Sequence, residues 1–115
     1  MKGLDRKALE QVAGYFQSLA EPTRLQLLNA LRNGEMTVSE LADHAASTAA
    51  NVSKHLSLLA KGGFVDRRSE GTSVYYRITD PDIYALCDLV CGQIAKRLSA
   101  QAGAHSVFRK AARRS

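Results

Sequence analysis

The feature that constrains this chain most is a change in hydrophobic period at Gly62-Gly63. Before these glycines, apolar residues recur every three or four positions in four segments, as on the buried faces of amphipathic helices. After them, residues 64–69 and 73–78 are rich in β-branched and aromatic side chains, and a loop over residues 70–72 joins them, which predicts a β-hairpin. A long helical pattern then begins at Asp82 and runs to about Ala102. The predicted order is helix, helix, short helix, helix, hairpin, helix.

Capping and stop signals give the boundaries of the predicted helices. Pro22 suits the first turn of a helix, and Thr37 and Glu40 have the spacing of a capping box. The turn over residues 45–48 consists of small residues, which let two helices cross closely. The order predicts a winged helix-turn-helix fold, mainly α with a small β-hairpin (α+β). The predicted helices cover residues 5–20, 22–33, 38–45, 49–61 and 82–102.

The length of 115 residues predicts a single domain, over residues 1–102, followed by a flexible basic tail over residues 103–115. The net charge is +5, but four of the 16 basic residues lie in the last seven positions, so net charge alone is weak evidence for nucleic acid. There is no run of 18 apolar residues and no signal peptide, which predicts a cytoplasmic protein with no membrane partner. The three histidines lack a nucleophile or acid at motif spacing, and no Gly-rich phosphate loop occurs, so we expect no enzyme activity.

The second helix of a helix-turn-helix pair enters the major groove of DNA and reads bases near its start. There, Asn51 can pair bidentately with adenine, and Lys54 can reach guanine or phosphate. The predicted hairpin carries Arg67 and Arg68 beside a glycine tip, which suits a strand pair that lies along the DNA backbone. The predicted DNA-binding residues are Thr48, Ala49, Asn51, Ser53, Lys54, His55, Arg67, Arg68 and Thr72.

Five stretches resemble, in order and spacing, the signatures of the ArsR/SmtB family of regulators. The resemblance covers roughly residues 9–98. It implies a homodimeric repressor that sits on double-stranded operator DNA and leaves when an inducer binds, with the first and last helices forming the dimer interface. The stretches are Leu19–Leu28 (LAEPTRLQLL), Thr37–Ala42 (TVSELA), Val52–Leu56 (VSKHL), Gly63–Arg68 (GFVDRR) and Gly71–Arg77 (GTSVYYR).

The chain departs from the family's patterns at its sensor sites. Arsenic and cadmium sensors often carry a Cys-x-Cys pair on the short third helix, but residues 40–44 contain no thiol. The positions that match the zinc site of the last helix include Gln93, a poor ligand, and Lys96, which would repel a cation. Ala49 and Ala50 stand where many members have Gln and Pro, so the operator of those members does not carry over.

Cys87 and Cys91 lie one helical turn apart on the last predicted helix, and the chain has no other cysteine. One interpretation is that both pack as small apolar residues. The other is an inducer site for arsenite or a soft metal ion, or for oxidation or persulfide chemistry; no cofactor is certain. Their Cβ atoms would be about 5–6 Å apart, whereas a disulfide needs about 3.8 Å, so a bond within one intact helix would be strained.

Three interpretations of the function follow from these patterns. The chain is either an inducible regulator or a ligand-independent winged-helix regulator with structural cysteines; a winged-helix module for protein contacts is the alternative from another class. We also predict a homodimer, because the first and last helices offer more apolar surface than one small domain can cover. The apolar residues behind that prediction are Phe16, Leu19, Val90, Ile94 and Leu98.

Overall fold

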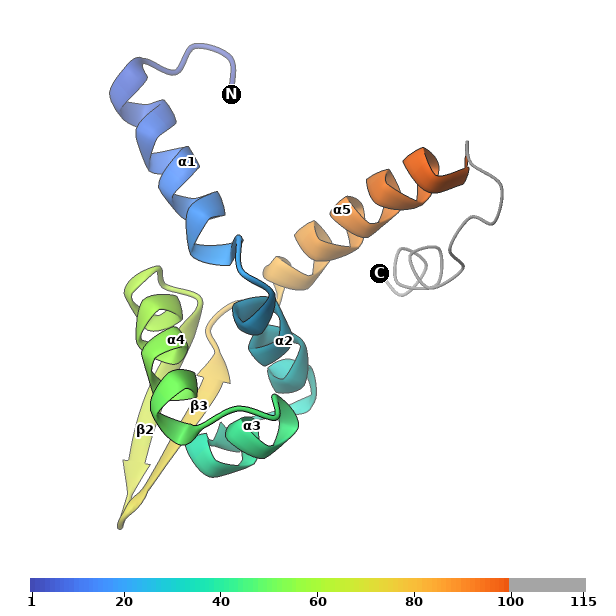
Figure 1. Ribbon diagram of the computed structural model, residues 1–115. Helices are drawn as coiled ribbons and strands as arrows, with labels where there is room; N and C mark the ends of the chain where they lie inside the picture. Colours follow the sequence, from blue (N-terminus) through green and yellow to red (C-terminus); the bar gives the residue numbers. More distant parts are fainter. Residues whose placement is uncertain (100–115) are drawn as a thin grey trace. The chain divides into compact units, whose positions relative to one another are not determined.

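The computed structural model describes residues 1–99, which form five α-helices and a three-stranded sheet (Figure 1). They fall into two compact units, Met1–Thr79 and a second one that begins at Asp80. No helix within residues 1–99 is long and apolar enough to cross a membrane. The predicted tail over residues 103–115 lies outside the described residues. The elements are α1 (Arg6–Leu19), α2 (Pro22–Ala30), a 3₁₀ helix (Leu31–Asn33), β1 (Met36–Thr37), α3 (Val38–His44), α4 (Ala49–Lys61), β2 (Val65–Glu70), β3 (Ser73–Ile78) and α5 (Asp82–Ser99).

Side-chain caps define where the helices of the first unit begin. Thr37 and Glu40 form the predicted capping box: the Glu40 N–H donates to Thr37 Oγ1 at 3.1 Å, and the Thr37 N–H donates to Glu40 Oε1 at 2.9 Å. Thr48 caps α4 by accepting a hydrogen bond from the Asn51 N–H at 3.1 Å. The predicted boundaries of α4, residues 49–61, are confirmed.

We expect Thr37→Ala to lower the free energy of unfolding by about 1 kcal/mol, because the first turn of α3 loses its cap. Urea denaturation measures this, and Ser39→Ala is the matched control, since Ser39 is exposed in the same turn. The backbone N–H and the hydroxyl of Thr37 lower the pKa of Glu40. The ionised carboxylate of Glu40 therefore stabilises the folded protein at neutral pH, and this stabilisation is lost as the pH falls through the lowered pKa. The prediction is contradicted if Ser39→Ala lowers the free energy of unfolding as much as Thr37→Ala does.

The sheet has one strand more than the predicted hairpin. Its order is β1-β3-β2, and all pairs are antiparallel. Glu70 pairs with Ser73, so the loop is the two residues Gly71-Thr72, with Gly71 at a φ of 62°. The predicted loop over residues 70–72 is thus one residue too long, because two-residue loops with positive φ match the twist of a hairpin best.

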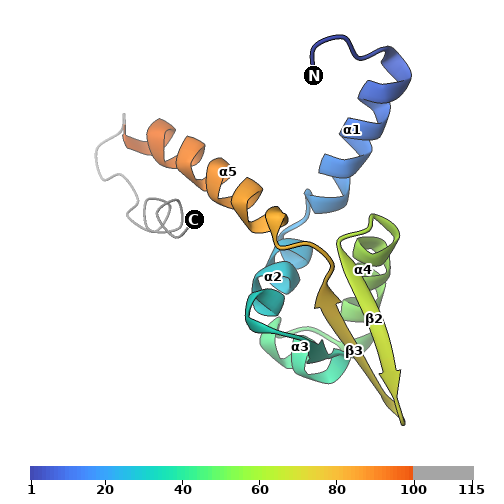
Figure 2. The same cartoon turned by 180° about the vertical axis from the view of Figure 1, so that it is seen from behind.

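The core of the first unit lies where α2, α3 and α4 meet the sheet. In Figures 1 and 2, α4 lies across one face of the β2–β3 hairpin. The reversal between α3 and α4 places Ala46 in a left-handed conformation, with φ of 50°. The side chains below 2% exposure are Leu27, Leu28, Leu41, Val52, Leu56, Leu59 and Val65.

One face of α1 remains uncovered within the described chain. Leu9 and Phe16, seven residues apart, are 40% and 49% exposed. Leu19, in contrast, is only 8% exposed. Leu19 therefore belongs to the core of its own chain, and its predicted part in a dimer face is corrected, because the C-terminal half of α1 packs against α4 and Phe64.

The predicted apolar stripe of helix α5 is only partly covered within the described chain. Ile83, Asp88 and Ala95 are buried, whereas Leu89 and Val90 are 68% and 48% exposed. Val90 lies two turns after Ile83 on the same side of α5, so the predicted stripe begins buried at Ile83 and is exposed at Val90. The predicted end of this helix, near residue 102, lies outside the described residues.

Candidate DNA-binding surface

The start of α4 presents polar side chains to solvent. Val52, Leu56 and Leu59 anchor the helix in the core, and the opposite face of its first turns is exposed. Thr48, Ala49, Asn51 and Lys54 are exposed, and Ser53 is half-buried.

Asn51 and Lys54 are the two long polar side chains on this exposed face. The amide of Asn51 donates to Ser47 Oγ at 2.9 Å, which positions it at the first turn. One amide hydrogen and the carbonyl oxygen remain for the bidentate contact that an adenine edge requires. No carboxylate pairs with Lys54 within residues 1–99. The helix start therefore offers one group suited to bases and one unpaired cation.

His55 does not share this exposed face. Its side chain is 14% exposed, and its Nδ1 atom lies 3.6 Å from Glu21 Oε2 at the corner before α2. That distance is too long for a hydrogen bond, and Nδ1 is buried with no other partner in the described chain. The structure thus turns the predicted DNA-contacting histidine towards α2, and it is not part of the surface that we describe.

The hairpin carries two adjacent arginines in different electrostatic surroundings. Arg68 donates to Glu35 Oε1 at 2.6 Å and to Glu70 Oε2 at 2.9 Å, and its guanidinium lies 4.6 Å from the ring centre of Tyr75. The hydrogen bond from Arg68 lowers the pKa of Glu35, and the two carboxylates raise the pKa of Arg68. Arg67 is exposed and has no carboxylate partner within residues 1–99. Arg67 is therefore the hairpin cation that is available to an external phosphate.

Glu35 is a residue of this surface that the sequence did not reveal. It lies 33 positions before Arg68 and reaches it only because β1 joins the sheet beside β3. Its one local signal is its place between Gly34 and β1, which is too weak to suggest a partner.

The two parts of the candidate surface lie at the same end of the first unit. Figures 1 and 2 show the hairpin turn, residues 71–72, at the end where α4 begins. Thr72 is exposed in that turn. A polar helix start and a wing that projects beside it are the two elements that a winged helix-turn-helix presents to DNA.

The two cysteines belong to the second unit. Both are thiols rather than halves of a disulfide, and both are partly exposed. Within residues 1–99, no group of three or more His, Cys, Asp or Glu side chains is placed to hold a metal ion. One described chain therefore offers two thiols at most to a soft ion.

Comparison with known proteins places this geometry among transcriptional regulators. A family model described as a helix-turn-helix domain matches residues 19–68. The chain is 39% identical over 74 residues to a probable mercury resistance operon repressor of Streptomyces lividans, a match that covers 64% of this chain and 59% of that repressor. It is 38% identical over 85 residues to the transcriptional regulator NmtR of Mycobacterium tuberculosis, covering 74% of this chain and 71% of NmtR.

A solved structure agrees with the fold. The solution structure of the homodimeric winged helix-turn-helix DNA-binding domain of Mb0332 from Mycobacterium bovis, a possible ArsR-family regulator, superposes with a TM-score of 0.71. The two chains are 38% identical, and the match covers 91% of this chain and all of that fragment. The chain thus spans the whole of a solved DNA-binding domain, but only 59% of the mercury repressor.

Proposed function

This chain belongs to the ArsR/SmtB family of winged helix-turn-helix transcriptional regulators, and from that premise we propose that it is a cytoplasmic repressor that binds operator DNA as a homodimer. Membership in a family of regulators agrees with the expectation of no enzyme activity. The repressor named for mercury resistance and the homodimeric domain of Mb0332 support the two parts of the proposal.

The observation that carries the proposal is the set of exposed polar groups at one end of the first unit. Asn51 and Lys54 project from the first turns of α4, and Arg67 projects from the wing with no carboxylate within residues 1–99 to neutralise it. In such a surface, cations bind phosphates and fix the position of the protein along the duplex, while an amide near the helix start reads a base edge. The proposed DNA-binding residues are Thr48, Ala49, Asn51, Ser53, Lys54, Arg67 and Thr72, with Arg68 in a supporting position.

We also propose that an inducer releases the repressor through the thiols of Cys87 and Cys91. Their partial exposure supports a reaction with a small reagent. The candidate inducers are arsenite, a soft metal ion, an oxidant or a persulfide. Two thiols on one chain would leave a metalloid or metal under-coordinated, so the partner subunit or the reagent itself supplies the other ligands.

The adjacent arginines provide a sharp test of the DNA surface. We expect Arg67→Ala to weaken binding to all duplexes about equally and to reduce the slope of log K against log salt by about one. Arg68→Ala is expected to change that slope less, because Glu35 and Glu70 already neutralise this guanidinium. Fluorescence anisotropy over a salt series measures both, on a duplex that the protein selects from a random pool.

Three outcomes of the same salt titration would contradict the proposed DNA surface. A parent protein that selects no duplex, or whose affinity does not depend on salt, would not bind DNA through phosphates. Equal slopes for Arg67→Ala and the parent would place the phosphate contacts elsewhere on the molecule.

A further inference from the structure

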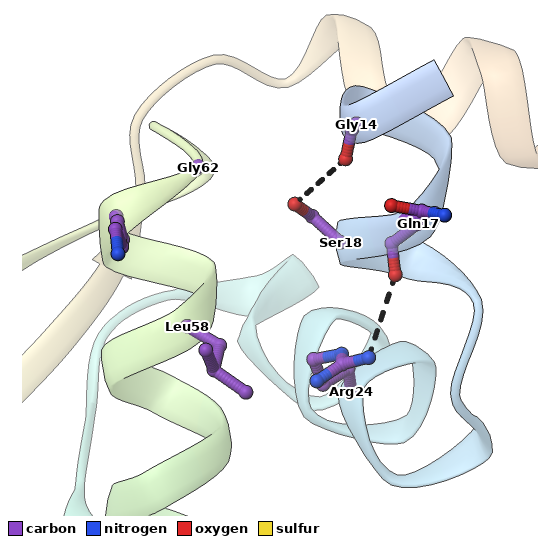
Figure 3. Close-up of a pocket in the computed structure, with 7 residues that line it drawn as sticks. Gly14, Gln17, Ser18, Arg24, Leu58 and Gly62 are labelled. Carbon is purple, nitrogen blue, oxygen red and sulfur yellow. Dashed lines mark hydrogen bonds between the residues drawn. The ribbon is translucent and has the colours of Figure 1, made fainter. Parts of the chain in front are cut away.

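A hollow of about 320 Å³ lies between α1, α2 and α4 within the first unit. Figure 3 shows Ser18 of α1 on the side that faces Leu58 of α4, and the backbone carbonyl of Gln17 pointing towards Arg24 of α2. It lies towards the end of α4 that is remote from the hairpin turn (Figure 1). The hollow is therefore separate from the proposed DNA surface.

The charge in this hollow is positive and unbalanced. Arg24 and Lys61 both line it, and no acidic residue of the described chain does. Neither cation has a carboxylate partner within residues 1–99. Glu21, close to Arg24 in sequence, accepts a hydrogen bond from the backbone N–H of Arg24 at 3.1 Å and lies beside His55, so it does not pair with the guanidinium.

The guanidinium of Arg24 is also short of hydrogen-bond acceptors. Its Nη2 donates to the carbonyl of Gln17 at 3.4 Å, a long bond. Its Nε is buried and has no partner in the described chain. Buried donors are normally satisfied, and a guanidinium has five N–H groups in a planar fork that fits an oxyanion. The guanidinium therefore has unused donors, which the oxygens of a carboxylate or phosphate could accept from.

The other residues of the hollow add an apolar surface at Leu58 and leave no room for a side chain at Gly62. Leu58 is 39% exposed and supplies an apolar surface. A Cβ on Gly62 would lie 3.0 Å from the ring of Phe64 and 3.3 Å from Ser18 Oγ, so the wall at Gly62 is tight. The volume lies at the small end of the range for ligand sites, about 300–1,000 Å³. A hollow of this volume accommodates a small molecule.

We propose that this hollow binds a small carboxylate with an apolar body. The carboxylate takes the fork of Arg24, Lys61 supplies a second positive charge, and the apolar body packs on Leu58. The proposal does not depend on DNA binding, because no residue of the hollow belongs to the proposed DNA surface.

Amide proton–nitrogen NMR of the full chain tests the site. Benzoate, inorganic phosphate and chloride are titrated at matched ionic strength to millimolar concentrations. Benzoate is expected to shift the amides of Gly14, Ser18 and Gly62 in a saturable way, phosphate more weakly and chloride not at all. Phosphate binding as tight as benzoate would overturn the class of ligand, and no saturable shift would overturn the site.

Matched variants separate this site from general attraction of anions. Arg24→Gln is expected to weaken benzoate binding at least about tenfold, since charged hydrogen bonds are lost. Arg24→Lys keeps the charge without the planar fork and is expected to lose part of the affinity, and Lys61→Gln less than Arg24→Gln. Lys7→Gln, an exposed charge on α1, should bind as the parent does. The proposal is overturned if Lys7→Gln weakens benzoate binding as much as a folded Arg24→Gln or Arg24→Lys variant does.

Discussion

Replacing Phe16 with Asp is expected to convert the protein into a monomer and to weaken operator binding by more than about a hundredfold. Leu9 and Phe16 lie on one face of α1 and are 40% and 49% exposed. Burying each large apolar side chain against a partner contributes about 1.5–3 kcal/mol. An aspartate there would be buried unpaired at a cost of several kcal/mol, and twofold symmetry applies the change twice.

Loss of the dimer removes DNA affinity because a symmetric operator has two half-sites about one helical turn apart. A monomer binds one half-site only. In the dimer, binding of the first subunit makes binding of the second an intramolecular step, and this gain in affinity is lost in the monomer. Sedimentation measures the mass at micromolar concentration, and fluorescence anisotropy measures the affinity. The two losses should occur together.

Gln11→Asp is the control, since Gln11 is exposed on the opposite side of α1 and gains the same charge. This variant should remain a dimer with the affinity of the parent. Circular dichroism checks that Phe16→Asp is folded. We expect no large change, because the Phe16 side chain is 49% exposed and, among the aromatic rings of residues 1–99, its ring meets only that of Tyr15, edge-on, with 5.8 Å between the ring centroids. A dimeric Phe16→Asp would exclude this face of α1 from the interface.

Features set by neighbours along the chain could be predicted from the sequence. The capping box at Thr37 and the bounds of α4 each depend on residues within one or two turns. The hairpin followed from composition and from Gly71 at its tip. The family's motifs lie on these same elements, so the fold and the general location of the candidate DNA surface followed from the sequence.

Features set by distant residues could not be predicted. Strand β1 has only two residues and exists because Met36 pairs with Tyr76 across the sheet. That pairing brings Glu35 to Arg68 and neutralises an arginine that the sequence did not distinguish from its neighbour. Helical periodicity likewise showed that α4 has two faces but not that Glu21 would face His55.

Replacing both Cys87 and Cys91 with serine is expected to leave operator affinity within about twofold of the parent and to abolish its response to the inducer. The substitution changes one atom per side chain, and neither thiol lies on the proposed DNA surface. The thiols are one turn apart on α5 and partly exposed. The response is measured as release of a labelled duplex on addition of arsenite, a persulfide donor or hydrogen peroxide.

Each reagent leaves a different product on the parent protein. Arsenite bound by thiolates raises the intact mass, and a persulfide donor adds sulfur. Peroxide takes two electrons from two thiols, giving one disulfide and two waters. Because Cβ atoms one turn apart are about 5–6 Å from each other and a disulfide needs about 3.8 Å, we expect the oxidised link to join two chains, which a non-reducing gel shows as a doubled mass.

Ala85→Ser is the control on the same helix, since it adds a hydroxyl at an exposed position and leaves both thiols in place. It should respond as the parent does. A parent that keeps its DNA in all three reagents, or a double variant that still releases it, would assign both cysteines to packing. Release of the parent by one reagent alone would identify the chemistry of the inducer, because that reagent's product would then be the only one that alters how α5 packs.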